Sequence, residues 1–497
     1  MISLREFLLS CILLVQLASA DTCSSLQENT DIEVASPLSV SYIDEQNEYW
    51  STSCSALKPS CIIFPKDAAE VASIVKILND NTENFAIKSG GHNPNNYFAS
   101  VAGGPLISTQ KLDQALLDPE TGILRAGPGN RLDGISAKLD GTGWTFVGGR
   151  IGNTGIGGLI LGGGLSYMSA EYGWSASSVL EYEVVLANGT IATASSTQNA
   201  DLFKALKGGG NNFAIVTAYT LQTYRQGDVW GGNLVFIHSD ETAAKLLKAV
   251  RDFTEYNEDD KAAVIVTAER GNIDLLDSWI LFLFYDGPEP PEATFKNFTD
   301  VGPILNTCKT RTYANLMGTS NWVVVPLSVV QIGTETIPLP SAEYGEDVMG
   351  GIHAHWRNVS GTALLEPGII ASIAYQPFPK RIAQAARERG EDLIDADDAV
   401  DRLIIELNYS FLPQGDYDKM AATHEQTYGG VRERVLEWQD EGKLPSDVYL
   451  PIFMNYGFSR QDYWARLRPE SREFAHRVSL EVDPDGFFRE RTGGWKP

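Results

Sequence analysis

Two glycine-rich segments of the chain contain the residue types that could bind a cofactor. The first, residues 88–93, reads Lys-Ser-Gly-Gly-His-Asn and follows an apolar stretch at residues 85–87 that predicts the end of a strand. Adjacent glycines let the backbone approach a ligand closely and adopt positive φ angles. With a lysine and a serine before the glycines and an imidazole after them, this loop could cradle a phosphate-bearing cofactor and offer it a nucleophile.

The second segment spans residues 148–164 and is dense in glycine. It does not match the dinucleotide-binding fingerprint, because Ile160 takes the position of the third glycine after Gly155 and Gly157. The sequence also lacks the phosphate-binding loop pattern of nucleotide hydrolases. A nicotinamide-dependent enzyme and an NTPase are therefore poorly supported.

The net charge and the N-terminal residues limit which partners and which location we expect for the protein. The 497-residue chain has a formal net charge of −25 at pH 7. A surface of this charge repels phosphate backbones, which argues against nucleic-acid binding. Residues 1–20 contain Arg5, an apolar core at residues 7–17 and Ala-Ser-Ala at residues 18–20, which predict a cleaved signal peptide. No other run is long enough to cross a bilayer, so we expect a secreted or lumenal protein without a membrane span.

Cysteine usage agrees with an oxidising compartment. After the signal peptide the chain has four cysteines, an even number that suggests disulfides, at Cys23, Cys54, Cys61 and Cys308. Four cysteines allow three pairings, and the sequence does not choose among them. Because three of them lie close together near the N-terminus, we expect one local bridge there. Glycosylation sequons occur at Asn188, Asn297, Asn358 and Asn408.

The elements that must position these motifs follow from apolar periodicity. Residues 62–225 predict a mixed region with a capped helix after Asp67 and a hairpin at the Asn188-Gly189 turn. Residues 230–445 alternate strand-like and helical runs, which predicts a sheet backed by helices. The expected strands include residues 280–284, 369–375 and 403–409, and the expected helices include residues 240–256, 380–392, 415–438 and 466–480.

The order of the motifs resembles a known family. The Lys-Ser-Gly-Gly-His loop, the glycine tract, the Asn-Gly hairpin and residues 201–213 with their three consecutive glycines resemble the berberine-bridge-enzyme-like FAD-linked oxidoreductases. These belong to the vanillyl-alcohol-oxidase superfamily, with a PCMH-type FAD-binding domain. Phe-Met-Asn-Tyr at residues 453–456 and Asp-Pro at residues 483–484 resemble its closing segment. The resemblance is strong over residues 62–225 and weak over residues 230–445.

The resemblance implies an α+β fold. We expect a PCMH-type FAD-binding fold of two α/β subdomains, with a substrate domain whose antiparallel sheet is backed by helices. The implied division is a signal peptide at residues 1–20, an FAD-binding domain at residues 21–227, a substrate domain at residues 228–445, and a C-terminal segment at residues 446–497 that returns to the FAD-binding domain.

The resemblance also assigns residues to the cofactor. His92 matches the histidine that forms an 8α covalent link to FAD. Some members add a second link through a cysteine, but Ile151 occupies that position here, so we expect a single link. The other residues expected at the cofactor are Lys88, Ser89, Gly90, Gly91, Asn93, Gly149, Ile151, Gly152, Thr154, Gly155, Gly157, Gly158, Gly162, Val216, Asn455 and Tyr456.

The sequence offers three candidates for the catalytic base. Family members often have a tyrosine where this chain has Phe453, which cannot accept a proton. Tyr456 is our first candidate for the base and Tyr409 the second, with Glu406 on the same apolar run. Strand alternation puts Glu406 on the same face as Asn408, and we expect that face to meet solvent.

The resemblance implies the reaction. We expect oxidation of a small organic molecule, such as a secondary-metabolite intermediate, by hydride transfer to FAD with reoxidation by dioxygen, in a monomeric enzyme. A flavin-carrying cyclase and a carbohydrate oxidase are the alternatives. We expect no metal site: His353 and His355 would share a face on a strand, but no carboxylate or cysteine completes a ligand set.

Overall fold

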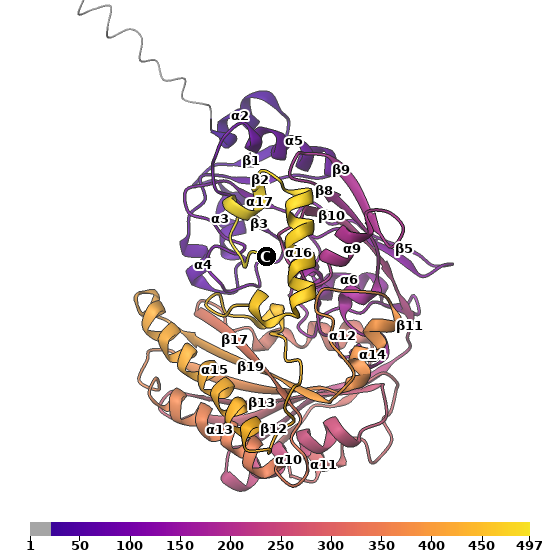
Figure 1. Ribbon diagram of the computed structural model, residues 1–497, viewed down its shortest axis with the longest axis vertical. Helices are drawn as coiled ribbons and strands as arrows, with labels where there is room; N and C mark the ends of the chain where they lie inside the picture. The colour runs from indigo at the N-terminus through magenta and orange to yellow at the C-terminus, as the bar shows by residue number, and fades with distance from the viewer. Residues whose placement is uncertain (1–20) are drawn as a thin grey trace, which may run out of the picture.

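The computed structural model describes residues 21–497. The expected signal peptide, residues 1–20, lies outside the described residues. Figure 1 shows the first and last segments of the chain together in the upper part of the molecule, and the middle of the chain below them.

A small mixed sheet contains the strand that precedes the glycine-histidine loop. Its order is β1-β2-β4-β3, and β4 runs parallel to both β2 and β3. Its strands are β1 (Glu33–Ala35), β2 (Ile62–Phe64), β3 (Ala86–Lys88) and β4 (Leu106–Ser108). The surrounding helices are α2 (Thr22–Asn29), α3 (Val40–Asn47), α4 (Thr52–Ala56) and α5 (Ala68–Asn79).

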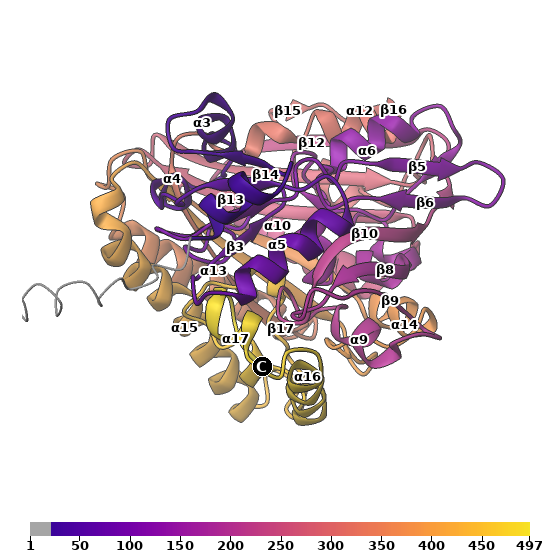
Figure 2. The same cartoon turned by 90° about the horizontal axis from the view of Figure 1, so that it is seen from above.

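A second sheet is antiparallel, with the order β5-β6-β10-β8-β9. Its strands are β5 (Ala115–Asp118), β6 (Ile123–Ala126), β8 (Val179–Val185), β9 (Ile191–Ser195) and β10 (Ile215–Gln222), and β7 (Trp144–Thr145) and β11 (Tyr224–Arg225) pair beside it. Helix α5 packs between the two sheets (Figure 2). Asp67 caps α5 by accepting a 2.9 Å hydrogen bond from the Glu70 backbone, as the sequence predicts.

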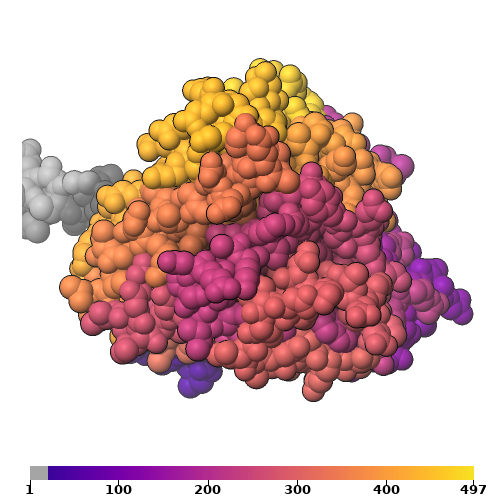
Figure 3. Space-filling view, turned by 90° about the horizontal axis from the view of Figure 1, so that it is seen from below, coloured from indigo at the N-terminus to yellow at the C-terminus, as the bar shows by residue number. Residues whose placement is uncertain are grey.

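The middle of the chain forms a large antiparallel sheet in the order β15-β12-β14-β13-β18-β19-β17. Its strands are β12 (Val229–Ile237), β13 (Ala262–Gly271), β14 (Leu276–Tyr285), β17 (Val329–Pro338), β18 (Ile370–Phe378) and β19 (Arg402–Phe411), with β15 (Leu305–Asn306) and β16 (Lys309–Arg311) at the edge. One face packs on three helices, α10 (Asp240–Tyr256), α13 (Gly345–Gly361) and α15 (Tyr417–Asp440). Seen from below, segments coloured magenta to orange make up most of the surface (Figure 3).

The chain ends beside its beginning. Helix α17 (Phe487–Arg491) packs on the core of the first sheet, and helix α16 (Pro469–Val482) packs on α9 (Ala200–Ala205) (Figure 1). The ring of Phe487 contacts Phe85, with centroids 4.9 Å apart, and Arg491 donates to the carbonyl of Glu83. The expected α+β fold with an antiparallel sheet backed by helices is confirmed, while the domain boundaries themselves stay a prediction.

Several remaining elements carry site residues or close the sheets. The helices of the two smaller sheets are α6 (Leu132–Leu139), α7 (Ile156–Leu161), α8 (Ser169–Tyr172) and α9 (Ala200–Ala205). Those beside the large sheet are α11 (Lys296–Thr299), α12 (Tyr313–Gly318) and α14 (Lys380–Glu388).

The structure decides the cysteine pairing. Cys23 and Cys61 form a disulfide with Cα atoms 6.1 Å apart, so one local bridge is present. Cys54 is free and buried, and Cys308 is free and half-buried.

One local expectation is wrong. His353 and His355 lie on helix α13, not on a strand, so they do not share a face. His353 stacks on buried Trp279, and His355 bonds the carbonyl of Thr427. Among residues 21–497, no group of three or more histidine, cysteine or acidic residues could hold a metal ion. In the same part of the chain, none of the helices has the length and apolar character needed to span a membrane.

Candidate functional site

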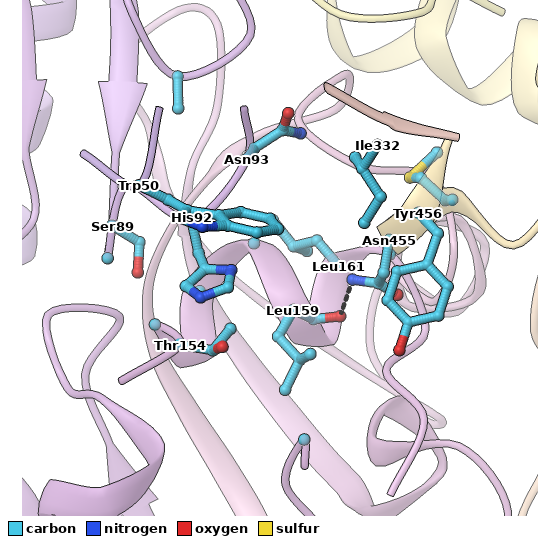
Figure 4. A pocket seen from close by; sticks show the side chains of 18 of the residues that line it. Trp50, Ser89, His92, Asn93, Thr154, Leu159, Leu161, Ile332, Asn455 and Tyr456 are labelled. Atoms are coloured by element: carbon cyan, nitrogen blue, oxygen red, sulfur yellow. Dashed lines mark hydrogen bonds between the residues drawn. The ribbon is translucent and has the colours of Figure 1, made fainter. Parts of the chain in front are cut away.

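A cavity of about 350 Å³ lies where the glycine-histidine loop, the glycine tract, the large sheet and the C-terminal segment meet. Figure 4 shows Trp50 and His92 together on one side of this cavity, with Asn455 and Tyr456 on the other. The two sides bring together residues that are far apart in the sequence.

The loop after β3 presents His92 to the cavity. Gly91 has a φ of 68°, a left-handed conformation that favours glycine. The imidazole stacks on the Trp50 indole with ring centroids 4.6 Å apart. Burial, and after it the charge of Arg131, lower the pKa of His92 to about 4. The ring is therefore neutral at pH 7 and keeps one nitrogen lone pair for bond formation.

The two glycine-rich segments touch through their backbones. A Cβ atom at Gly155 would lie 2.4 Å from the backbone nitrogen of Gly90, and one at Gly157 would lie 2.9 Å from the Ser89 side chain. Glycine is therefore required for this close approach. Asn455 holds the end of the tract by donating a 3.0 Å hydrogen bond to the Leu159 carbonyl (Figure 4).

Several polar atoms in the cavity wall are buried and have no hydrogen-bond partner among residues 21–497. They are Trp50 Nε1, His92 Nε2, Thr109 Oγ1 and Asn212 Oδ1. Buried polar groups are normally paired. This set of unpaired donors and acceptors, beside glycines that leave room for a ligand, fits a long polar cofactor such as the expected FAD.

A hydrogen-bonded network closes the other side of the cavity. The Arg150 guanidinium donates a 2.6 Å hydrogen bond to the Tyr456 hydroxyl and another to the Gln376 carbonyl oxygen. The Gln376 amide donates a 2.7 Å hydrogen bond to the Glu406 carboxylate. Arg150 comes from the glycine tract, Gln376 and Glu406 from the large sheet, and Tyr456 from the C-terminal segment, so the network joins three parts of the fold.

Burial and the charge of Arg150 act in opposite directions on the pKa values of both acidic groups in the network. Burial raises the pKa of Tyr456, and the charge of Arg150 opposes that increase. Burial also raises the pKa of Glu406, while Arg150 and hydrogen bonds from Gln376 and Tyr456 lower it. The arrangement can therefore accept and hold a proton close to the cavity.

The register of the large sheet aligns polar side chains along the cavity wall. Glu269 pairs with Ser372, which pairs with Asn408 on the next strand. Glu406 lies two residues from Asn408, and both line the cavity. The expectation that Glu406 meets solvent is therefore wrong, because this face of the sheet packs toward the glycine tract. Burial raises the pKa of Glu269 to about 7.

Most of the sequence-predicted cofactor residues line this cavity. They are Ser89, Gly90, Gly91, His92, Asn93, Gly149, Ile151, Thr154, Gly155, Gly157, Gly158, Gly162, Val216, Asn455 and Tyr456.

Two predicted cofactor residues do not line the cavity. The ammonium of Lys88 is buried and lies 2.6 Å from the Glu45 carboxylate, so it is not free for a phosphate. Gly152 lies against the backbone of Met317, where a Cβ atom would be 2.5 Å from the carbonyl oxygen. Both residues serve the packing around the site.

Tyr409 also lies elsewhere. Its side chain points to the helix-covered face of the large sheet, where its hydroxyl is 2.9 Å from Thr427 Oγ1 on α15. Alternation along β19 sends Tyr409 away from the face that carries Glu406. The structure therefore removes Tyr409 from the candidates for the base.

Among the residues of the cavity wall that were not predicted from the sequence are Trp50, Arg150 and Glu269. Arg150 could have been predicted from the sequence, because it is the one charged residue in the glycine tract. Glu269 is two residues from Thr267 and four from Ile265 on β13, so strand alternation puts the three on one face. It does not show what that face contacts. Trp50 lies in a segment without a recognisable motif.

Comparisons with known proteins agree with this site. The model of a family described as "FAD binding domain" matches residues 59–195. An uncharacterized FAD-linked oxidoreductase of Arthroderma benhamiae is 41% identical over 468 residues, which cover 94% of this chain and 92% of that protein. The FAD-dependent monooxygenase FUP4 of Fusarium proliferatum is 28% identical over 472 residues, covering 92% and 88%.

Solved structures show the same fold. Berberine bridge enzyme from Eschscholzia californica matches with a TM-score of 0.74 and 18% identity, covering 95% of this chain and 98% of that one. Glucooligosaccharide oxidase from Acremonium strictum, described with a 6-S-cysteinyl, 8α-N1-histidyl FAD, matches with a TM-score of 0.74 and 18% identity, covering 94% and 98%. With its cavity, glycine segments and relatives, this chain belongs to the FAD-linked oxidoreductases, and it has the fold of berberine bridge enzyme.

Proposed function

We propose that this enzyme oxidises a small organic molecule by hydride transfer to FAD that is covalently attached through His92, with dioxygen as the final electron acceptor. One observation carries the proposal: a single cavity has His92 and the glycine segments on one side and the Tyr456–Arg150–Gln376–Glu406 network on the other.

The cofactor side supports a single covalent link. His92 offers a neutral, buried imidazole, and the nearest candidate for a second link, Ile151, has no reactive group. The histidyl link in the Acremonium strictum oxidase shows that this fold accommodates such an attachment. When bound, FAD would accept a hydride from the substrate and pass its electrons to dioxygen.

The network supplies a path for the substrate proton. Tyr456 accepts a hydrogen bond from Arg150, which favours negative charge on its oxygen, and its own proton can pass to the nearby Glu406 carboxylate. A substrate hydroxyl or amine could therefore lose its proton to Tyr456 Oη as the hydride leaves the neighbouring carbon. Positioned proton transfer of this kind contributes typically about 10²–10⁴-fold to rate.

The wall formed by the large sheet indicates the type of substrate. It combines apolar side chains with two hydroxyls, an amide and two carboxyls: Ile265, Phe282, Ile332, Ala374, Thr267, Ser372, Asn408, Glu269 and Glu406. A mixed surface of this kind suits an amphipathic organic molecule, in keeping with a secondary-metabolite intermediate.

We place the enzyme in the secretory pathway. Its disulfide, Cys23–Cys61, requires an oxidising compartment to persist. Three of the four sequon asparagines, Asn188, Asn297 and Asn358, are exposed, whereas Asn408 lines the cavity. We therefore expect glycans at the first three positions only.

Anaerobic flavin reduction tests the proposal. The purified holoenzyme is mixed without oxygen with a benzylic alcohol, a cyclic amine, an oligosaccharide and a polyene, and its visible absorbance is followed. We expect one of the first two to bleach the flavin, and air to restore the colour. Bleaching by the oligosaccharide alone would identify a carbohydrate oxidase. Consumption of the polyene without bleaching would contradict hydride transfer and identify a cyclase.

A further inference from the structure

The segment at residues 45–50 contacts the glycine-histidine loop along its length. Glu45, on α3, forms a buried ion pair with Lys88 at the start of the loop, with 2.6 Å between Nζ and Oε1. Ser108 donates a second hydrogen bond of 2.7 Å to the same carboxylate oxygen. These two donors fix α3 against the ends of β3 and β4.

Trp50 lies at the other end of this segment, beside His92. Its backbone N–H donates a 3.0 Å hydrogen bond to the Gly91 carbonyl. Its indole stacks on the imidazole with the ring planes inclined by 30° (Figure 4). Offset stacking at this separation is favourable for aromatic rings. Trp50 therefore constrains both the backbone before His92 and the plane of its ring.

One nitrogen of the His92 ring has no partner to hold it within the described part of the chain. Nε2 is buried and has no hydrogen-bond partner among residues 21–497. Arg131, which contributes to keeping the ring neutral, has its guanidinium engaged with Glu48 at 2.6 Å and with the Asn153 carbonyl. The Asn153 side chain and the backbone of His92 itself also reach the ring. The stack with Trp50 is the aromatic contact of the imidazole, and it sets the plane of the ring.

We propose that Trp50 is the positioning residue for covalent flavin attachment, because its indole holds the His92 imidazole in the orientation needed to bond the 8α-methyl carbon of FAD. This inference rests on the attachment proposed above. One C8α–H bond and the imidazole N–H bond break, and one N–C8α bond forms. Two protons and two electrons pass to the isoalloxazine and then to dioxygen, so each attachment releases one hydrogen peroxide.

Orientation decides the rate of such a step. A nucleophile held in a reactive geometry gains a large advantage over a rotating one, and a displacement of about 1 Å can cost about 100-fold. Without the indole, the imidazole can turn about both of its side-chain torsions into the space that Trp50 leaves. Attachment should then slow down while the cavity still binds FAD.

The test measures the rate of attachment in the full chain. Trp50→Phe keeps a stacking ring, whereas Trp50→Leu keeps apolar volume without a ring. Protein purified with little flavin is incubated with excess FAD in air, and covalent flavin is measured at intervals as fluorescence of the acid-precipitated protein. Flavin absorbance of the native protein reports total binding, and hydrogen peroxide is counted. Trp144→Leu, which removes a half-buried tryptophan outside the cavity, is the control.

We expect Trp50→Leu to bind FAD but to attach it about 10–100-fold more slowly than the wild type. The attachment rate of Trp50→Phe should lie between those of Trp50→Leu and the wild type, and that of Trp144→Leu should match the wild type. A Trp50→Leu chain that attaches FAD at the wild-type rate would overturn this inference alone. One that binds no FAD would also contradict it, because the indole would then serve folding or binding. A wild-type protein that attaches no flavin would overturn the proposed covalent link as well.

Discussion

The two sides of the cavity are built differently. On the side of His92, backbone segments touch at Gly90 and Gly155, and the buried Lys88–Glu45 ion pair fixes the adjoining strand. On the side of the large sheet, the wall consists of side chains at alternate strand positions. There the Glu269 carboxyl has no hydrogen-bond partner among residues 21–497.

Because of this difference, the fold restricts the residues on the cofactor side more than those on the side of the large sheet. Contacts between backbones require particular residues at particular positions, so the cofactor side cannot change without loss of the fold. A strand needs only alternation of buried and cavity-facing residues. The large sheet can therefore exchange its cavity-facing side chains and, with them, the substrate.

The proton path should show the largest effect. Tyr456→Phe removes the hydroxyl between Arg150 and Glu406, so we expect flavin reduction, by whichever compound bleaches the flavin in the anaerobic assay, to slow by about 10²–10⁴-fold. Tyr409→Phe is the matched control, because its hydroxyl lies on the far face of the same sheet. Stopped-flow measurement of the rate of flavin reduction in both variants tests this prediction. Equal rates for Tyr456→Phe and the control would show that the base lies elsewhere.

The buried ion pair tests the rigidity of the cofactor side. Lys88→Met leaves the Glu45 carboxylate buried without its cation, so we expect the free energy of unfolding to fall by about 3–5 kcal/mol. Lys204→Met is the control, since its partner Glu391 is largely exposed and such pairs contribute about 0–1 kcal/mol. Denaturant unfolding measures the free energy of unfolding of both variants. A loss no larger than that of the control would mean that the cofactor side tolerates change.

Backbone contact between the glycine segments should have a smaller effect on stability. In Gly155→Ala the new methyl group would meet Gly90, and overpacking of this kind costs typically about 1–3 kcal/mol. Gly134→Ala on α6 is the control, because the space around its Cβ is open. The ratio of flavin to protein absorbance should fall for Gly155→Ala alone. A normal ratio would show that the two segments need not touch.

Glu269 should show the smallest effect, and one that depends on pH. Because burial raises its folded-state pKa to about 7, the unfolded chain releases this proton first, and stability is lost as pH rises from about 4.5 to 7. Glu269→Gln removes that loss, so its Tm should exceed the wild-type value by about 2 °C at pH 8 and match it at pH 4. Exposed Glu388→Gln is the control. A Tm difference that does not change with pH would contradict this account.

The elements of the fold could largely be predicted because they depend on local signals. The range expected for one helix, residues 240–256, is that of α10, where Ser239 provides the cap. The strands at residues 280–284, 369–375 and 403–409 fall within or overlap β14, β18 and β19. His353 and His355 were misplaced because their spacing was considered without the helical period of Val348, Ile352 and Trp356, which are all buried on α13.

The residues on the cofactor side of the cavity could be predicted from the sequence better than those on the side of the large sheet. His92 and the glycines could be found because their types and order carry the chemistry. Glu406 and Asn408 could be placed on one face, but strand alternation does not say which face meets the rest of the molecule. Trp50 could not be found, because its role depends on a contact across more than forty residues of chain.

Peptide mapping of the flavin tests the central claim most directly. The wild-type protein is precipitated with acid, washed and digested, and the flavin-bearing peptide is identified by mass spectrometry. We expect the precipitate to stay yellow and one peptide, containing His92, to carry the mass of FAD. Flavin that remains in the supernatant, or that is bound to a peptide without His92, would contradict the account.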